Sequence, residues 1–156
     1  MSPAVMADGP SRLLARLSPA RVSEKTAPFF LWKERFVLGA SDVDADHRSF
    51  FELANRVRAA ILAGNGPAVA RLALARMADH ARAHFDHEER CLVRSACPHL
   101  AEHLEEHRQF TLALSQLEAE PSPSPERIFC LTRDWILDHI LGMDRRHQPW
   151  IALGAR

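Results

Sequence analysis

The stretch ARAHFDHEERCLVR, residues 81–94, places two metal-ligand side chains on one face of a predicted helix. His84 and Glu88 are four residues apart, and side chains at this spacing lie one above the other on a helix. Upstream, Ala73 and Met77 continue the same stripe with apolar side chains at helical spacing. Polar groups on a buried stripe lower stability unless something satisfies them. The stretch therefore predicts a buried helix that presents an imidazole and a carboxylate to a partner inside the fold.

The same spacing recurs downstream, in a second helix that we expect to open at Pro98. His103 and His107 are again four residues apart, and Phe110 and Leu114 continue their face with apolar side chains. This second pair predicts a helix whose early turns carry two imidazoles toward the core.

A further helix precedes this pair of helices. We expect it to begin after Ser41, a good N-cap residue, and to carry His47 on its apolar stripe. Residues 64–67, Gly-Asn-Gly-Pro, end it, and their proline takes the first position of the next helix, predicted over 67–94.

A fourth helix follows the proline-rich residues 121–125, with Ser124 as its expected cap. It carries His139 and Asp144. Their spacing of five residues does not suit an ideal α-helix, so we expect a local distortion or the last helical turn at this point.

These four helices, joined by short connections, predict an all-α, up-down-up-down four-helix bundle with an N-terminal extension. The ligand-type residues lie alternately early, late, early and late in successive helices, which brings them to one level of such a bundle. The seven are His47, His84, Glu88, His103, His107, His139 and Asp144.

Five imidazoles and two carboxylates exceed the needs of one structural zinc ion, which binds four ligands. They suit two metal ions bridged by the carboxylates, and imidazole with carboxylate favours iron, copper, zinc or manganese over magnesium or calcium. The alternative for any single position is a buried core histidine with ordinary hydrogen bonds. Four further histidines are expected at the surface or rim: His80, His87, His99 and His147.

The predicted boundaries are a loosely ordered tail over residues 1–28, a helical domain over 29–148 and a C-terminal stub over 149–156. The aromatic lead-in at 29–40 should pack on the core. The formal net charge of +0 gives no basic field for nucleic acid or an anionic membrane, and no apolar run is long enough to span one. Three cysteines, expected as buried thiols, favour a cytoplasmic location; they are Cys91, Cys97 and Cys130.

The motifs also resemble a known family, the hemerythrins, and in particular the bacterial ones. The resemblance covers residues 32–147 and is carried by Val43-Asp44-Ala45-Asp46-His47, by His84-Phe85-Asp86-His87-Glu88-Glu89, by Pro98 with His103 and His107, and by Trp135 with His139-Ile140 and Asp144. It implies two iron ions with an oxo or hydroxo bridge that bind O₂ reversibly.

The resemblance also implies a role for each residue. One iron would be held by His103, His107 and His139, and the other by His47 and His84, which leaves a position for O₂. Glu88 and Asp144 would bridge the pair. Trp135, Ile136 and Ile140 match positions that line the O₂ pocket in the family, and they also suit the bundle core. Asp44 and Asp46 are candidates for orienting ligand imidazoles, although Asp44 would equally serve as a first-turn partner of the helix dipole. Glu89 points off the ligand face and is expected either in solvent or in contact with a ligand.

Some positions depart from the pattern of the family. Asp46 stands where Gln is common, Leu92 where Met is common, Ala96-Cys97 where Gly-Tyr is common, and His147 where Tyr is common. None of these is an implied iron ligand, so the departures bear on pocket polarity and access rather than on iron binding.

The expected function is O₂ storage, delivery or buffering by a binding protein rather than an enzyme. Three alternatives remain open: a sensor of O₂, NO or redox state that acts through a partner, a di-iron peroxidase or ferroxidase, and a metal-storage bundle. Expected partners are O₂ and either an oxygen-using enzyme or a signalling protein.

Overall fold

The computed structural model describes residues 28–156, apart from the side chains of residues 66–68. The tail expected over residues 1–28 therefore lies outside the described part, except for Pro28. In chain order the elements are the short 3-10 helix η2 (Glu34–Phe36), α2 (Ser41–Leu62), α3 (Gly66–Arg94), α4 (Leu100–Glu118), α5 (Pro125–Trp135), the π-helix η3 (Ile136–Asp144) and α6 (Arg145–Gly154). The described part is all-helical, as predicted.

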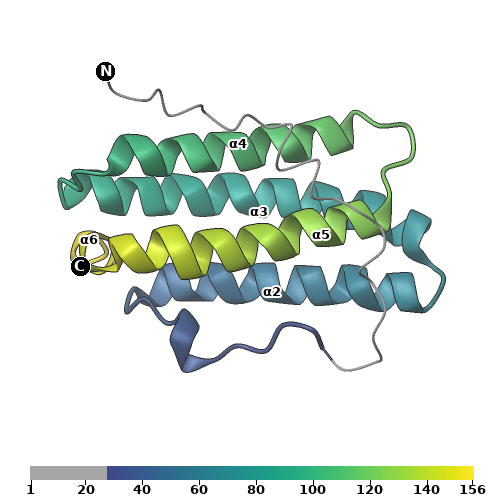
Figure 1. Ribbon diagram of the computed structural model, residues 1–156, viewed down its shortest axis with the longest axis horizontal. Helices are drawn as coiled ribbons and strands as arrows, with labels where there is room; N and C mark the ends of the chain where they lie inside the picture. The colour runs from purple at the N-terminus through teal and green to yellow at the C-terminus, as the bar shows by residue number, and fades with distance from the viewer. Residues whose placement is uncertain (1–27) are drawn as a thin grey trace, which may run out of the picture.

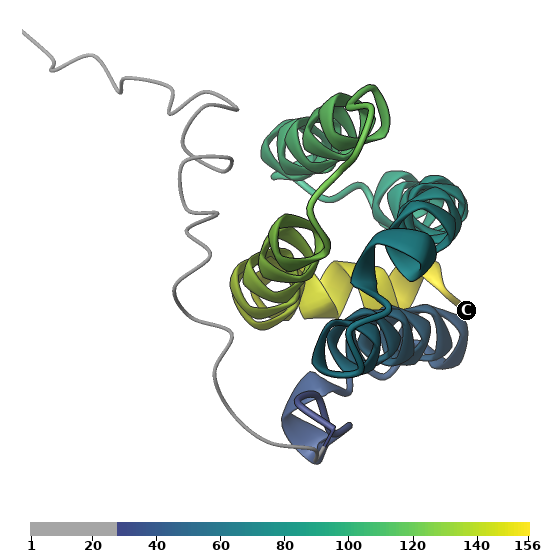
Figure 2. The ribbon, with the colours of Figure 1, turned by 90° about the vertical axis from the view of Figure 1, so that its right-hand side faces the viewer.

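The four long helices lie antiparallel and form an up-down-up-down bundle (Figure 1). Helix α2 packs against α3 and α5, and α3 packs against α4. The view along the bundle shows the four helices at the corners of a rectangle (Figure 2). This confirms the predicted architecture. None of the helices over residues 28–156 is long and apolar enough to cross a membrane.

Apolar side chains from all four helices fill the bundle. The core includes Phe50, Met77, Phe110, Leu114 and Ile128, each no more than 1% exposed. Burying a large apolar side chain contributes about 1.5–3 kcal/mol, so this cluster supplies the main driving force for folding. All three cysteines are buried, and within the described residues none forms a disulfide.

The aromatic lead-in packs on this core, as the sequence predicts. Phe30 and Phe36 are buried, and the ring of Phe36 meets Phe51 of α2 edge-on at 4.6 Å. Asp44 fixes the end of the lead-in, because its carboxylate accepts hydrogen bonds from the backbone N–H groups of Leu38 at 2.8 Å and Gly39 at 3.2 Å.

The helix ends agree with the sequence in one case and differ in another. Ser124 caps α5 by accepting a hydrogen bond from the N–H of Arg127. Ser41, expected to precede the first helix as its cap, is instead its first residue, and Ala40 holds the cap position without a side-chain hydrogen bond. Asp44, in the first turn of α2, instead ties the preceding amides of Leu38 and Gly39 to the helix.

The fourth helix changes geometry where the five-residue spacing of His139 and Asp144 indicated a distortion. Residues Ile136–Asp144 form a π-helix, whose wider turns bring side chains five residues apart onto one face. The chain then continues into α6, which crosses the end of the bundle (Figures 1 and 2). Residues 149–154, predicted to lie in a C-terminal stub, are part of α6, which packs against α3.

Candidate metal centre

The seven predicted ligands converge near the end of the bundle that carries the α3–α4 connection and α6. His47 lies early in α2, His84 and Glu88 late in α3, and His103 and His107 early in α4. His139 and Asp144 come from the π-helix η3. None of the seven side chains belongs to a residue more than 2% exposed.

Three imidazoles form one group. The Nε2 atom of His107 lies 3.1 Å from the Nε2 atoms of both His103 and His139. Imidazole nitrogens bound at about 2.1 Å and at right angles would lie about 3.0 Å apart, against about 3.4 Å in a tetrahedron. The observed separations are therefore short enough for these nitrogens to bind one metal ion.

A second group contains His47 and His84, and Glu88 belongs to both groups. Donor atoms of Glu88, His103, His107 and His139 lie within 4.8 Å of one another, and so do those of His47, His84 and Glu88. The Oε2 atom of Glu88 is 3.1 Å from His103 Nε2 and 3.6 Å from His84 Nε2. One carboxylate thus faces both groups of imidazoles.

Asp144 also faces both groups, through a different oxygen on each side. Its Oδ1 lies 2.9 Å from His139 Nε2, and its Oδ2 lies 3.3 Å from His47 Nε2. A carboxylate that turns one oxygen toward each of two donor groups has the arrangement of a bridging ligand.

Several donor atoms of this cluster have no hydrogen-bond partner within residues 28–156. They are both ring nitrogens of His47 and His84, Glu88 Oε1 and both oxygens of Asp144. An unsatisfied buried polar group costs about 1–3 kcal/mol, and more when it is charged. A pair of cations between the two groups would satisfy the Nε2 atoms of His47 and His84 and the carboxylate oxygens, so the residues present fit a two-metal centre.

The outer nitrogens of the first group are held by hydrogen bonds. His107 Nδ1 donates to Glu89 Oε1 at 2.9 Å, and His139 Nδ1 donates to Glu106 Oε2 at 2.8 Å. Such bonds set the tautomer and the ring plane of a ligand histidine. Glu89 therefore plays the orienting role considered for it, whereas Glu106 was missed because its partner lies 33 residues away in the sequence.

The second group is held less closely from outside. Asp46 Oδ2 lies 3.5 Å from His84 Nδ1 and 3.3 Å from His87 Nδ1. Asp46 thus faces a predicted ligand, as expected, while Asp44 turns to the backbone of the lead-in instead.

The prediction for His147 was wrong. His80 and His87 are half-buried and His99 is exposed, as expected, but His147 is fully buried. Its Nδ1 atom lies 2.9 Å from His103 Nδ1. This contact could not be predicted from the sequence, because it depends on the direction in which α6 crosses the bundle.

Burial and neighbouring charges shift the pKa values of the cluster in different directions. Burial lowers the pKa of His84 to about 4, which favours the neutral imidazole. Burial also opposes the charge on His139, but the neighbouring Asp144 outweighs it and, together with Glu106, raises the pKa of His139 to about 10. Despite burial, contact with His103 and His107 holds the pKa of Glu88 well below its usual range. The metal-free centre thus holds ionised Glu88 beside protonated His139.

The three pocket candidates are buried, and one of them, Trp135, contacts the cluster. Trp135 is 4% exposed, and Ile136 and Ile140 are fully buried in the core. The indole ring of Trp135 stacks on the His139 ring at 4.6 Å and on the Phe110 ring at 4.5 Å. A cleft of about 190 Å³ reaches Trp135 and His139 from the surface; its other lining residues are Glu106, Gln109, Asp134 and Asp138.

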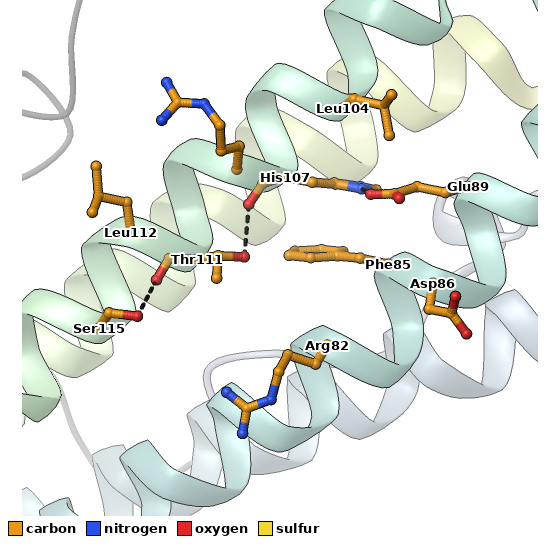
Figure 3. A pocket seen from close by; sticks show the side chains of 10 residues that line it. Arg82, Phe85, Asp86, Glu89, Leu104, His107, Thr111, Leu112 and Ser115 are labelled. Atoms are coloured by element: carbon orange, nitrogen blue, oxygen red, sulfur yellow. Dashed lines mark hydrogen bonds and ion pairs between the residues drawn. The ribbon is translucent and has the colours of Figure 1, made fainter.

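A wider groove of about 500 Å³ runs between α3 and α4 (Figure 3). Phe85 stacks on the His107 ring at 3.8 Å with their planes 12° apart, and Glu89 lies beside the same imidazole. Phe85 therefore covers the face of His107 that is turned to this groove.

Antiparallel helices that surround two histidine groups joined by carboxylates define a metal-binding helical bundle. The chain belongs to the hemerythrin family, since residues 38–151 match the hemerythrin HHE cation binding domain. It is 24% identical over 127 residues to a bacteriohemerythrin of Clostridium acetobutylicum, and the matched region covers 76% of this chain and 98% of that protein. It is 25% identical over 124 residues to a myohemerythrin of Riftia pachyptila, and the matched region covers 76% of this chain and 91% of that protein. No solved structure matches the chain significantly.

Proposed function

We propose that this protein binds O₂ reversibly at a pair of iron ions held by the seven residues His47, His84, Glu88, His103, His107, His139 and Asp144. The observation that carries the proposal is the position of Glu88, whose carboxylate belongs to both groups of buried imidazoles. Family membership supports it, because the matched domain is a cation-binding one. Imidazole and carboxylate ligands without thiolate suit iron, as they also suit copper, zinc and manganese.

The two groups offer unequal numbers of donors. The first supplies three imidazoles and the second supplies two, while Glu88 and Asp144 face both. If both metals are octahedral and share a solvent-derived bridge, the two-histidine side has one position left for an external ligand. A pair of iron ions, when bound, supplies the two electrons that reversible O₂ binding requires.

The surrounding side chains would protect such a site from water. Trp135 stacks on the ring of His139, and Ile136 and Ile140 are buried in the apolar core of the same bundle. Exclusion of water removes the protons that would promote loss of the bound ligand and oxidation of the metal. We propose that these three residues form the wall of the O₂ pocket. O₂ would then be the primary partner of the protein.

The experiment that tests this function measures iron per chain and the visible spectrum of the reduced protein under anaerobic conditions. The spectrum is then recorded after air is admitted and again after the air is stripped. The expected result is about two irons per chain and a charge-transfer band that appears with air and disappears on stripping.

A matched pair of variants sharpens the test. His84→Ala removes a ligand of the two-histidine group, whereas His80→Ala removes a half-buried histidine of the same helix whose Nε2 contacts the backbone oxygen of Asp46. We expect only His84→Ala to abolish the band. Irons that oxidise without a reversible band would instead indicate an enzyme or a redox sensor, and a protein that binds no iron would refute the proposal.

A further inference from the structure

His147 is a buried histidine that the seven-ligand centre does not include. It lies on α6, and its ring is fully buried against the end of the bundle. Its Nδ1 atom is 2.9 Å from the Nδ1 atom of His103, a hydrogen-bond distance between two ring nitrogens. One of these nitrogens must carry the proton that they share.

The other nitrogen of His103 decides which of them donates. His103 Nε2 points into the centre, 3.1 Å from Glu88 Oε2 and 3.1 Å from His107 Nε2. A neutral imidazole that gives its Nε2 lone pair to a metal carries its proton on Nδ1. His103 is therefore the donor in the metal-bound protein, and His147 Nδ1 is the acceptor.

This assignment determines the tautomer of His147 as well. With Nδ1 accepting, its own proton is on Nε2, an atom that is buried and has no hydrogen-bond partner within residues 28–156. A protonated Nε2 has no lone pair for a cation. His147 consequently does not form a second metal site with the nearby His99 and Glu102 while His103 is a ligand, although donor atoms of the three lie within 4.8 Å of one another.

We propose that His147 is a positioning residue of the metal centre: it accepts the Nδ1 proton of His103 and thereby fixes the tautomer and ring plane with which His103 faces the metal. The proposal rests on the proposed function only in requiring that the centre binds metal. It makes α6, which lies outside the four-helix bundle, part of the support of the centre.

The hydrogen-bond acceptor of His103 differs chemically from the acceptors of His107 and His139. His107 and His139 donate to the carboxylates of Glu89 and Glu106, whereas His103 donates to an uncharged ring. A carboxylate acceptor makes an imidazole a stronger metal donor than a neutral acceptor does. His147 therefore orients His103 without adding negative charge beside it.

The test compares His147→Leu, which removes the acceptor, with His147→Gln, whose side-chain oxygen is able to accept the same proton. His99→Leu is the matched control, because the His99 ring stacks on His147 at 5.4 Å, while the hydrogen bond from His103 N–H to the His99 carbonyl is a backbone contact that the substitution leaves in place. Affinity for Zn²⁺ is measured by competition with a chelator, and thermal unfolding of the metal-free proteins checks folding.

We expect His147→Leu to bind one of two zinc ions about 10–100-fold more weakly, the usual effect of losing such a partner. His147→Gln should retain affinity within a few-fold, and His99→Leu should match the wild type. Histidine ¹⁵N NMR of the zinc-loaded wild type should find the proton of His147 on Nε2. Full affinity in His147→Leu, equal losses in the Leu and Gln variants, or a proton on His147 Nδ1 would each overturn the proposal. A wild type that binds no zinc and no iron would overturn the proposed function and this role together.

Discussion

Gly154 of α6 approaches the backbone of Cys91 in α3 so closely that a Cβ atom on Gly154 would lie 1.9 Å from the Cys91 carbonyl oxygen. No side chain fits there without movement of one helix. This contact fixes where α6 crosses the end of the bundle, and with it the position of His147 on the same helix.

Gly154→Ala should therefore displace α6 and destabilise the protein by about 1–3 kcal/mol, as overpacking of a close contact does. Chemical denaturation measures the change in the free energy of unfolding. Gly142→Ala is the control, because a Cβ at Gly142 meets nothing within 4 Å. If the two variants were equally stable, the close approach of α6 to α3 would not hold in solution.

Substitution of Ala96 by glycine should increase stability, in contrast to Gly154→Ala. Ala96 follows α3 with φ at +52°, in the left-handed region, and its N–H bonds to Val93 O while the N–H of Cys97 bonds to Leu92 O. These two bonds form a Schellman motif, in which glycine is preferred at the left-handed position. Ala96→Gly should stabilise the protein by about 1 kcal/mol, seen as a higher Tm. Ala101→Gly, in the first turns of α4, is the control and should lower the Tm, since glycine weakens a helix.

The sequence predicted the bundle well because its information is local. The i,i+4 pairs His84/Glu88 and His103/His107 mark helical faces, and glycine and proline mark the turns. The five-residue spacing of His139 and Asp144 indicated a local distortion or the last helical turn, and the structure has a π-helix there. The division of the seven ligands into two groups came from the resemblance to the hemerythrins and not from helical spacing.

The sequence did not reveal contacts that depend on how one helix lies against another. His147 meets His103 across 44 residues, and no periodicity near His147 encodes the direction of α6. Asp44 and Asp46 were equivalent candidates for orienting imidazoles. Only the path of the lead-in, which places the amides of Leu38 and Gly39 beside Asp44, separates their roles.

His47 provides a test that distinguishes a metal ligand from a structural core histidine. It is fully buried; neither ring nitrogen makes a well-formed hydrogen bond within residues 28–156, although Nε2 lies 3.3 Å from Asp144 Oδ2. His47→Leu should raise the unfolding free energy of the metal-free protein by about 1–3 kcal/mol, because it removes unsatisfied polar atoms. The same variant should lose one metal ion.

Phe50→Ala, a core change in the same helix, is the comparison for His47→Leu. It should lower the stability of the metal-free protein by about 3–5 kcal/mol through the cavity it leaves. Loss of stability in metal-free His47→Leu would show that this histidine supports the core by itself, contrary to its proposed role.

Metal binding should become tighter as the pH rises, because of the proton on His139. Its pKa is raised from 6.5 to about 10 by Asp144 and Glu106 against the effect of burial, so the metal-free centre holds this proton at pH 7. A metal ion must displace it from Nε2, since Glu106 holds the proton on Nδ1. One displaced proton makes the affinity rise about tenfold per pH unit between pH 7 and 9.

The same shift has the opposite effect on the metal-free fold. A group whose pKa is higher in the folded state stabilises that state fully below its unfolded pKa, here 6.5, and the contribution disappears as the pH rises to about 10. Metal-free protein should therefore lose stability over this range while the affinity for metal increases. Calorimetric Zn²⁺ titrations in buffers of different ionisation enthalpy count the released protons. Glu106→Gln, which removes one of the two carboxylates beside His139, should release fewer protons at pH 8 than the wild type, and equal release would show that His139 is already neutral in the metal-free protein.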